Sequence, residues 1–73
     1  MSEVAALPLV ERRVRFDAHM RELLLMSVAD AGLEESDVDR YVDDAVTDQD
    51  VRNAVKEYAL DYDLTIYGQG WMR

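Results

Sequence analysis

The sequence predicts a mainly α-helical domain of three helices, which we place at about 17–32, 37–46 and 48–62. Two observations predict it: apolar residues recur at helical spacing in two stretches, and a short capping sequence precedes each of them. Proline and glycine together supply only four of the 73 residues, which is typical of a folded chain. We expect one small acidic domain, 1–73, in which 1–9 forms a flexible arm.

The first helix is expected at 17–32, and its middle, residues 20–29, is apolar around most of the helical circumference. Gly32 stands where a residue in the left-handed conformation often ends a helix, and Leu33 would then fold back onto Val28. Such an apolar helix is usually covered on two sides by other elements.

The second and third helices each follow a capping sequence, Ser36-x-x-Asp39 and Thr47-x-x-Asp50. In each, a hydroxyl and an acid three residues later can bond the free amides at the start of a helix. The apolar residues that follow form one helical face each: Val38, Tyr41, Val42, Ala45 and Val46, then Val51, Ala54, Val55, Tyr58, Ala59 and Tyr62. The short link between them predicts a sharp helical corner.

Residues 8–16 admit two interpretations. In one, a helix begins at Pro8. In the other, 13–16 alternates as a short strand with Val14 and Phe16 facing inward. We favour the strand, because Phe16 falls off the helical face that Val14 would define.

Residues 63–67 also alternate, with Leu64 and Ile66 on one side. The sequence therefore predicts that 63–67 pairs with 13–16 as a two-stranded ribbon formed by the chain ends. Isolated ribbons of two strands are weak, so this one would need the helices beneath it.

The net charge is −8 and is concentrated in residues 34–50, which hold eight acids and one arginine. Affinity for nucleic acids comes largely from lysine and arginine that neutralise phosphates, so direct binding of DNA or RNA is disfavoured. Anionic membrane surfaces are disfavoured for the same reason. A basic protein surface is the expected partner.

The residues that common active sites need are missing. No cysteine is present, so disulfides, thiolate catalysis and thiolate metal sites are not expected. His19 is the only histidine, and zinc sites usually need several His or Cys ligands. The pairs Asp48-x-Asp50 and Asp61-x-Asp63 lack the glycine and glutamate that a calcium loop requires. We therefore expect no enzyme, no metal, no cofactor and no small-molecule substrate.

Two groups of side chains are candidates for binding a partner. One is apolar and basic and lies at the chain ends, where aromatic and arginine side chains are typical interface anchors. The other is the acidic surface of the second helix, for which a solvated exterior is the ordinary alternative. The candidates are Leu7, Leu9, Val10, Arg12, Arg13, Asp39, Asp43, Asp44 and Trp71. Their distribution suggests two separate contact surfaces.

In size, acidity and lack of catalytic motifs, the chain resembles small phage-encoded regulators that bind bacterial RNA polymerase. The resemblance spans the whole chain without a signature motif, so it assigns no role to any residue. It implies a non-enzymatic protein in the cytoplasm of a bacterial host that binds RNA polymerase, inhibits initiation of transcription and can suppress termination. Two alternatives stay open: an acidic nucleic-acid mimic that inhibits a DNA- or RNA-binding defence protein or repressor, and a structural subunit or adaptor.

Overall fold

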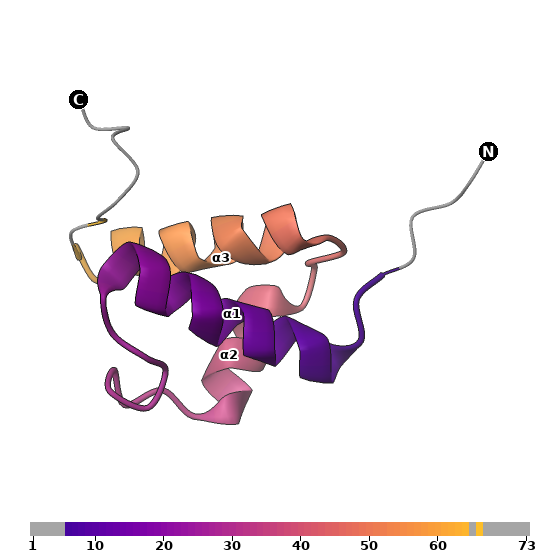
Figure 1. Cartoon of the computed structure of the whole chain (residues 1–73), viewed down its shortest axis with the longest axis horizontal. Coiled ribbons are helices and arrows are strands. Elements are labelled where there is room, and N and C mark those ends of the chain that lie inside the picture. Colours follow the sequence, from indigo (N-terminus) through magenta and orange to yellow (C-terminus); the bar gives the residue numbers. More distant parts are fainter. Residues whose placement is uncertain (1–5, 65, 67–73) are drawn as a thin grey trace.

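Three helices account for most of the residues described by the computed structural model, which are 6–64 and 66. They are α1 (Leu9–Leu24), α2 (Glu35–Val42) and α3 (Asp48–Asp61). Each helix packs against the other two. Figure 1 shows α1 and α3 running in the same direction, with the shorter α2 set across them. The expected all-α domain of three helices is therefore confirmed for the described residues.

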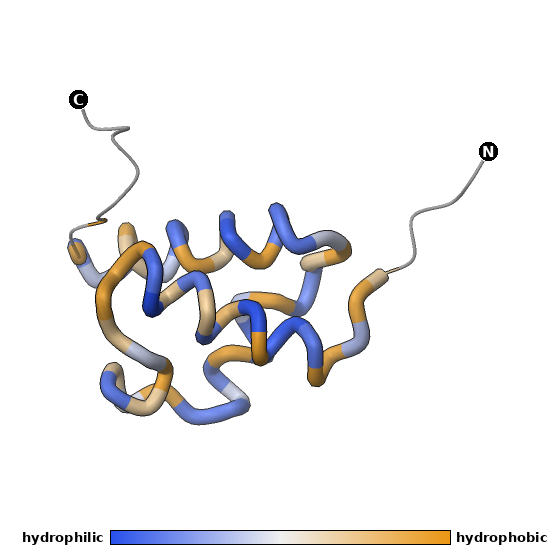
Figure 2. The backbone as a smooth tube through the Cα atoms, viewed as in Figure 1, coloured by the Kyte–Doolittle hydropathy of each residue, from blue (hydrophilic) through white to orange (hydrophobic). Residues whose placement is uncertain are grey.

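The hydrophobic core lies where the inner faces of the three helices meet. α3 illustrates the division in Figure 2, with hydrophilic residues along its outer side and hydrophobic residues toward the other helices. The buried apolar side chains are Phe16, Met20, Leu23 and Leu24 of α1, Val38 and Val42 of α2, Ala45 of the link, and Val51, Ala54, Val55, Tyr58 and Ala59 of α3.

α1 begins at Leu9 rather than at 17, so the strand expected at 13–16 is wrong. The helical face that meets the core contains Phe16, which is completely buried, whereas Val14 is 59% exposed. The alternation of 13–16 favours a strand only when Val14 is placed on the inner face, because Phe16 then has no place on a helix. With Phe16 inward, Met20 and Leu23 follow it at the spacing of one helical face.

α1 also ends earlier than expected, because Leu25 adopts the left-handed conformation with φ at 59°. A turn follows in which Asp30 N–H donates to Ser27 Oγ at 3.0 Å and Ser27 N–H donates to Asp30 Oδ2 at 3.3 Å. Asp17 Oδ1 accepts a hydrogen bond from Val28 N–H at 2.8 Å and holds this turn against α1.

Gly32 has φ at 76°, and Leu33 N–H donates to the carbonyl of Val28 at 3.1 Å. Both features were predicted from the sequence and are confirmed. They close the loop between α1 and α2, however, and do not end a helix.

α3 begins as predicted. Thr47 Oγ1 accepts from Asp50 N–H at 3.2 Å, and Asp50 Oδ2 accepts from Thr47 N–H at 3.1 Å. These reciprocal bonds satisfy two amides at the helix start that have no partner within the helix.

α2 differs from the helix expected at 37–46 at both ends. Its N-cap is Glu34, whose N–H donates to the Asp37 carboxylate at 3.1 Å, so Ser36 lies inside the first turn and is not the cap. It ends at Val42, whose carbonyl accepts from Ala45 N–H at 3.0 Å in a tighter turn. Farther along the link, Val46 O accepts from Leu7 N–H at 3.1 Å.

The segments next to the helices pack back onto them. Leu7, Leu64 and Ile66 are partly buried against the core. Of the ribbon strand expected at 63–67, residues 65 and 67 lie outside the described part of the chain, and Asp63, with φ at 57°, belongs to the turn that follows α3. Of the expected arm, 1–5 also lies outside the described residues.

The helical assignment of 13–16 makes a direct prediction. Phe16→Ala leaves a cavity in the core and is expected to lower the free energy of unfolding by about 3–5 kcal/mol. A chain of this size is stable by only about 3–5 kcal/mol, so the variant is expected to be largely unfolded by circular dichroism.

Val14→Ala is the matched control, because the side chain lies on the opposite, exposed face of the same helix. It is expected to change the free energy of unfolding by less than about 0.5 kcal/mol in urea titrations. Comparable losses in the two variants would mean that both side chains point inward, as in a strand.

Candidate functional site

Three arginines in the first half of α1, Arg12, Arg13 and Arg15, bind the other two helices. Arg13 forms a bidentate salt bridge with Asp39 of α2, with Nε at 2.8 Å from Oδ1 and Nη2 at 2.9 Å from Oδ2. This planar fork matches the geometry of a carboxylate. The hydrogen bonds from Arg13 hold the pKa of Asp39 below its ordinary value.

Arg12 reaches the C-terminal end of α2. Its Nη1 donates to the carbonyl oxygen of Val42 at 2.9 Å, and its Nε donates to the carbonyl oxygen of Leu7 at 2.9 Å. The last carbonyls of a helix have no partner within it and form the negative end of its dipole. A guanidinium at this position therefore stabilises the end of α2 and ties it to the start of α1.

Asp48, the first residue of α3, joins α3 to α1. Its Oδ1 lies 3.0 Å from His19 Nε2 and 3.2 Å from Arg15 Nη1. The hydrogen bonds from His19 and Arg15 lower the pKa of Asp48. A second ion pair joins the same two helices with the base on α3 and the acid on α1. Arg52 Nη1 lies 3.1 Å from Glu22 Oε1.

These contacts use the arginines of the described chain. All six arginines among residues 6–64 and 66 contact an acid or a carbonyl of the same chain: Arg12, Arg13, Arg15, Arg21, Arg40 and Arg52. The acids outnumber them. Within the same part of the chain, Asp43, Asp44, Glu57 and Asp63 make no side-chain hydrogen bond or ion pair.

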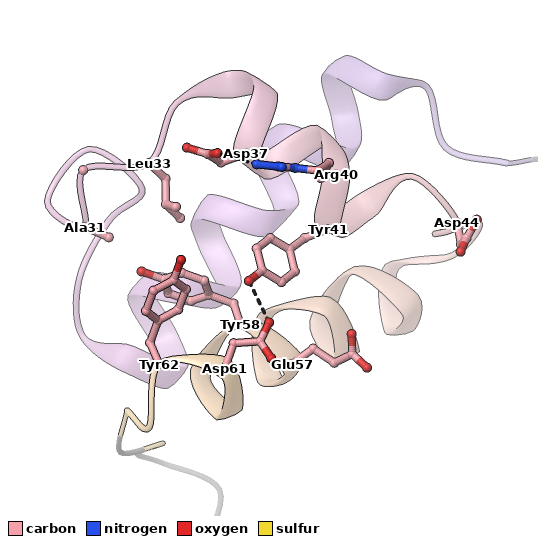
Figure 3. A pocket seen from close by; sticks show the side chains of 11 residues that line it. Ala31, Leu33, Asp37, Arg40, Tyr41, Asp44, Glu57, Tyr58, Asp61 and Tyr62 are labelled. Carbon is pink, nitrogen blue, oxygen red and sulfur yellow. Dashed lines mark hydrogen bonds and ion pairs between the residues drawn. The ribbon is translucent and has the colours of Figure 1, made fainter.

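An open hollow of about 750 Å³ lies between α2, α3 and the loop that contains Ala31 and Leu33. Figure 3 shows the side chains of α2 on one side of it and those of α3 on the other. Two kinds of side chain dominate its lining. They are the tyrosines Tyr41, Tyr58 and Tyr62, and the acids Asp37, Asp44, Glu57 and Asp61.

The three tyrosine rings form a chain of contacts, in which Tyr58 packs against both Tyr41 and Tyr62. The centroids of Tyr41 and Tyr58 are 5.6 Å apart in an edge-to-face arrangement, and those of Tyr58 and Tyr62 are 5.0 Å apart with tilted planes. Tyr41 also stacks on Phe16 of the core, with centroids 6.1 Å apart. Aromatic pairs at these distances stabilise each other beyond the area they bury. The tyrosines that line the hollow are thereby packed against the hydrophobic core.

One side-chain hydrogen bond joins α2 to α3 across the hollow. The hydroxyl of Tyr41 donates to Asp61 Oδ2 at 2.8 Å, as the dashed line in Figure 3 marks. Burial, together with this carboxylate, raises the pKa of Tyr41 to about 12. Burial also raises the pKa of Tyr58, whose ring lies between the other two.

The hollow carries an uncompensated negative charge. Its lining holds four carboxylates and one guanidinium, a net charge of −3. That guanidinium belongs to Arg40, which already pairs with Asp37 at 2.9 Å. Asp44 and Glu57 are left without a partner among the described residues, and Asp61 accepts only the tyrosine hydroxyl. Acids beside aromatic rings are an environment that attracts cations.

The described residues hold no group of three or more His, Cys, Asp or Glu placed to ligate a metal. Over the same stretch of chain, no helix is long and apolar enough to cross a lipid bilayer. A cation is the ligand that the charges and rings of the hollow can attract.

The candidate residues of the sequence separate into three groups. Arg12, Arg13 and Asp39 lie together within the fold, so the basic end and the acidic middle are in contact and do not form two separate surfaces. Leu7 is partly buried, while Leu9 and Val10 are exposed on α1. Asp43 and Asp44 are exposed at the end of α2, and Asp44 lines the hollow. Trp71 lies outside the described residues.

Sequence reasoning missed the tyrosines and acids that meet in the hollow. Tyr41, Tyr58 and Tyr62 were assigned to apolar helical faces, which is correct for their rings but neglects their hydroxyls. A useful indication was present in α3, where Glu57 and Asp61 are four residues apart and therefore share a face beside Tyr58.

The hydroxyl of Tyr41 is expected to contribute to stability. Tyr41→Phe removes the hydrogen bond to Asp61 and is expected to lower the free energy of unfolding by about 1 kcal/mol. Tyr62→Phe deletes the same atom from a side chain that is 62% exposed and is the matched control, with no measurable change in urea titrations. Equal effects of the two substitutions would contradict the assigned role of Tyr41.

The raised pKa of Tyr41 gives a dependence on pH. Its hydroxyl stays protonated in the folded chain up to about 12, whereas in the unfolded chain it ionises near 10.0. The stability linked to this group is therefore full below pH 10 and is lost as the pH rises toward 12. Ultraviolet absorbance of tyrosinate should reveal a titration near pH 12 that disappears in Tyr41→Phe. Ionisation of every tyrosine near pH 10 would contradict it.

Comparison of the chain with protein-family models, with curated proteins and with solved structures found no match. Its function is therefore inferred from its own side chains, above all from the hollow between α2 and α3.

Proposed function

We propose that this chain is a non-catalytic binding protein that docks onto a basic surface of a larger macromolecular machine through the hollow between α2 and α3. The observation that carries the proposal is the net charge of −3 in the hollow, where Asp44 and Glu57 have no partner among the described residues. Charges left unpaired next to a concave surface attract an oppositely charged partner and set its orientation.

The fold supports this mechanism by keeping its own arginines away from the hollow. Arg12, Arg13 and Arg15 are bound on the side of α1, and only Arg40 lines the hollow. The partner therefore meets a surface with a net negative charge, on which Arg40 is already paired with Asp37. Nucleic acid is disfavoured as a direct ligand, since its phosphates carry the same charge as the hollow.

Bacterial RNA polymerase is the partner that we propose to test first, on the resemblance to small phage-encoded regulators described above. Its channels for nucleic acid must be basic in order to hold phosphates. A small acidic protein seated at such a channel would inhibit initiation by excluding the template, and contact during elongation would suppress termination. This function would be exerted in the cytoplasm of a bacterial host.

A nucleic-acid mimic is the second candidate, and the unpaired acids favour it as well. Asp43, Asp44 and Glu57 would then occupy phosphate positions on a DNA- or RNA-binding repressor or defence protein. The two candidates differ in the protein that is bound: the first requires affinity for RNA polymerase, whereas a mimic requires affinity for a repressor or defence protein.

The proposal is tested by measuring the affinity of the chain for purified core and holoenzyme forms of a bacterial RNA polymerase at low and at high ionic strength. We expect binding that weakens with salt. The double variant Asp44→Asn, Glu57→Gln removes the two unpaired charges of the hollow and is expected to weaken binding about 2- to 30-fold. Inhibition of abortive initiation should fall in parallel.

The matched control is Asp43→Asn, Asp63→Asn, which removes two unpaired charges from positions outside the lining of the hollow. It is expected to retain most of the affinity. Equal losses in both double variants would indicate non-specific attraction by net charge and would overturn the proposed site. Absence of binding to either form of the enzyme would exclude RNA polymerase as the partner.

A further inference from the structure

We infer that the hollow holds an arginine side chain of the partner, with the guanidinium stacked on Tyr62 and bonded to Tyr58 and to the acids around them. The inference rests on the proposed function and specifies the residue of the partner that enters the site. It is carried by three features of the hollow: an exposed aromatic ring, a phenol hydroxyl without a partner, and carboxylates on the same helix.

The exposed ring is that of Tyr62, the residue that follows α3. It is 62% exposed although it is a large aromatic side chain, and it packs on Tyr58 with centroids 5.0 Å apart. One face of the ring is thereby fixed and the ring is held at the edge of the hollow. An aromatic ring that is held in place and open to solvent is a platform on which a planar cation can stack.

The phenol hydroxyl is that of Tyr58. The side chain of Tyr58 is only 5% exposed, yet its hydroxyl makes no hydrogen bond with any described residue, and it lines the hollow. In Figure 3 its ring reaches away from α3 toward the loop with Leu33. No buried side-chain oxygen or nitrogen of the described residues lacks a partner, so this oxygen is open to the hollow, where a donor from a ligand can replace water.

The carboxylates complete the site. Asp61 and Glu57 lie on α3 on either side of Tyr58 in the sequence, and both line the hollow. Asp61 is already held in place by the hydroxyl of Tyr41 at 2.8 Å, which leaves its other oxygen available. A guanidinium has five donors in a fixed plane, so it can bond a carboxylate and a phenol oxygen while it stacks on a ring.

The shape of the site favours arginine over other cations. A quaternary ammonium or a methylated lysine is typically bound in a cage of several exposed aromatic faces. Here only Tyr62 offers a largely exposed ring, since Tyr58 is buried and the hydroxyl of Tyr41 is bonded to Asp61. A single platform with acids at its side suits a flat cation with several donors, and lysine lacks the planar group that stacks.

The experiment uses three blocked tripeptides, Gly-Arg-Gly, Gly-Lys-Gly and Gly-citrulline-Gly, and follows two-dimensional NMR spectra of the full chain. Citrulline has the shape of arginine without its charge. We expect the arginine peptide to shift the resonances of Tyr58, Tyr62 and Asp61 in a saturable manner. The lysine peptide should bind more weakly, and the citrulline peptide should give no saturable shift. Equal affinity for arginine and lysine, or shifts located outside the hollow, would overturn the inference.

Tyr62→Leu keeps an apolar side chain on Tyr58 but removes the stacking platform, and it is expected to weaken binding of the arginine peptide about two- to fivefold. Leu60→Ala changes another exposed residue near the end of α3 and should leave the affinity unchanged, while dispersed spectra of both variants establish that they are folded. Unchanged affinity in Tyr62→Leu would overturn the stacking role.

If the peptide does not bind but polymerase binding still depends on Asp44 and Glu57, the arginine pocket is excluded and the proposed function survives. If neither binds, both proposals fail.

Discussion

The contact between α1 and α2 through Arg12 and Arg13 is the constraint on which the rest of the structure depends. α2 is only eight residues long, which is too short for a helix to be stable alone. Arg13 holds Asp39 in its middle and Arg12 holds the carbonyl of Val42 at its end. With α2 fixed in this way, Val38 and Val42 face the core and Tyr41 is placed opposite Asp61. The hollow exists because α2 is held at both points.

The same contacts determine where the charge of the molecule is compensated. A chain with a net charge of −8 has few positive groups, and the described arginines are bound to acids or carbonyls of the chain itself. Most of them join α1 to the other two helices, so compensation is concentrated on the side of α1. The side formed by α2 and α3 keeps Asp44 and Glu57 unpaired. The proposed attraction to a basic partner therefore rests on the way in which the fold pairs its own charges.

Short-range chemistry explains which features could be predicted from the sequence. The start of α3 at Thr47 and the left-handed Gly32 with its bond from Leu33 to Val28 depend on residues within six positions of one another, and both are present. The sequence alone does not place α1 correctly because either face of 9–24 carries apolar residues, and only packing against α2 and α3 decides that Phe16 is inward and Val14 is outward. The turn at Ser27 and Asp30 had the same hydroxyl-acid spacing as the helix caps and could have been recognised.

The candidate site could be predicted only in part, because it is assembled from distant segments. Asp44 was a candidate by charge, but its neighbour in the hollow, Glu57, comes from the next helix and meets it only in the folded chain. The pairing of Arg13 with Asp39 spans 26 positions and has no local pattern. Opposite charges far apart in a sequence give no indication of whether they meet each other or a partner.

The dependence of the fold on the α1–α2 contact is tested most directly by a double-mutant cycle of Arg13→Ala and Asp39→Ala, with unfolding followed in urea. Because each side chain is the main charged partner of the other, the account predicts that the double variant loses clearly less stability than the sum of the two single variants. Losses that add within the experimental error would show that the two side chains do not interact, and would contradict the account.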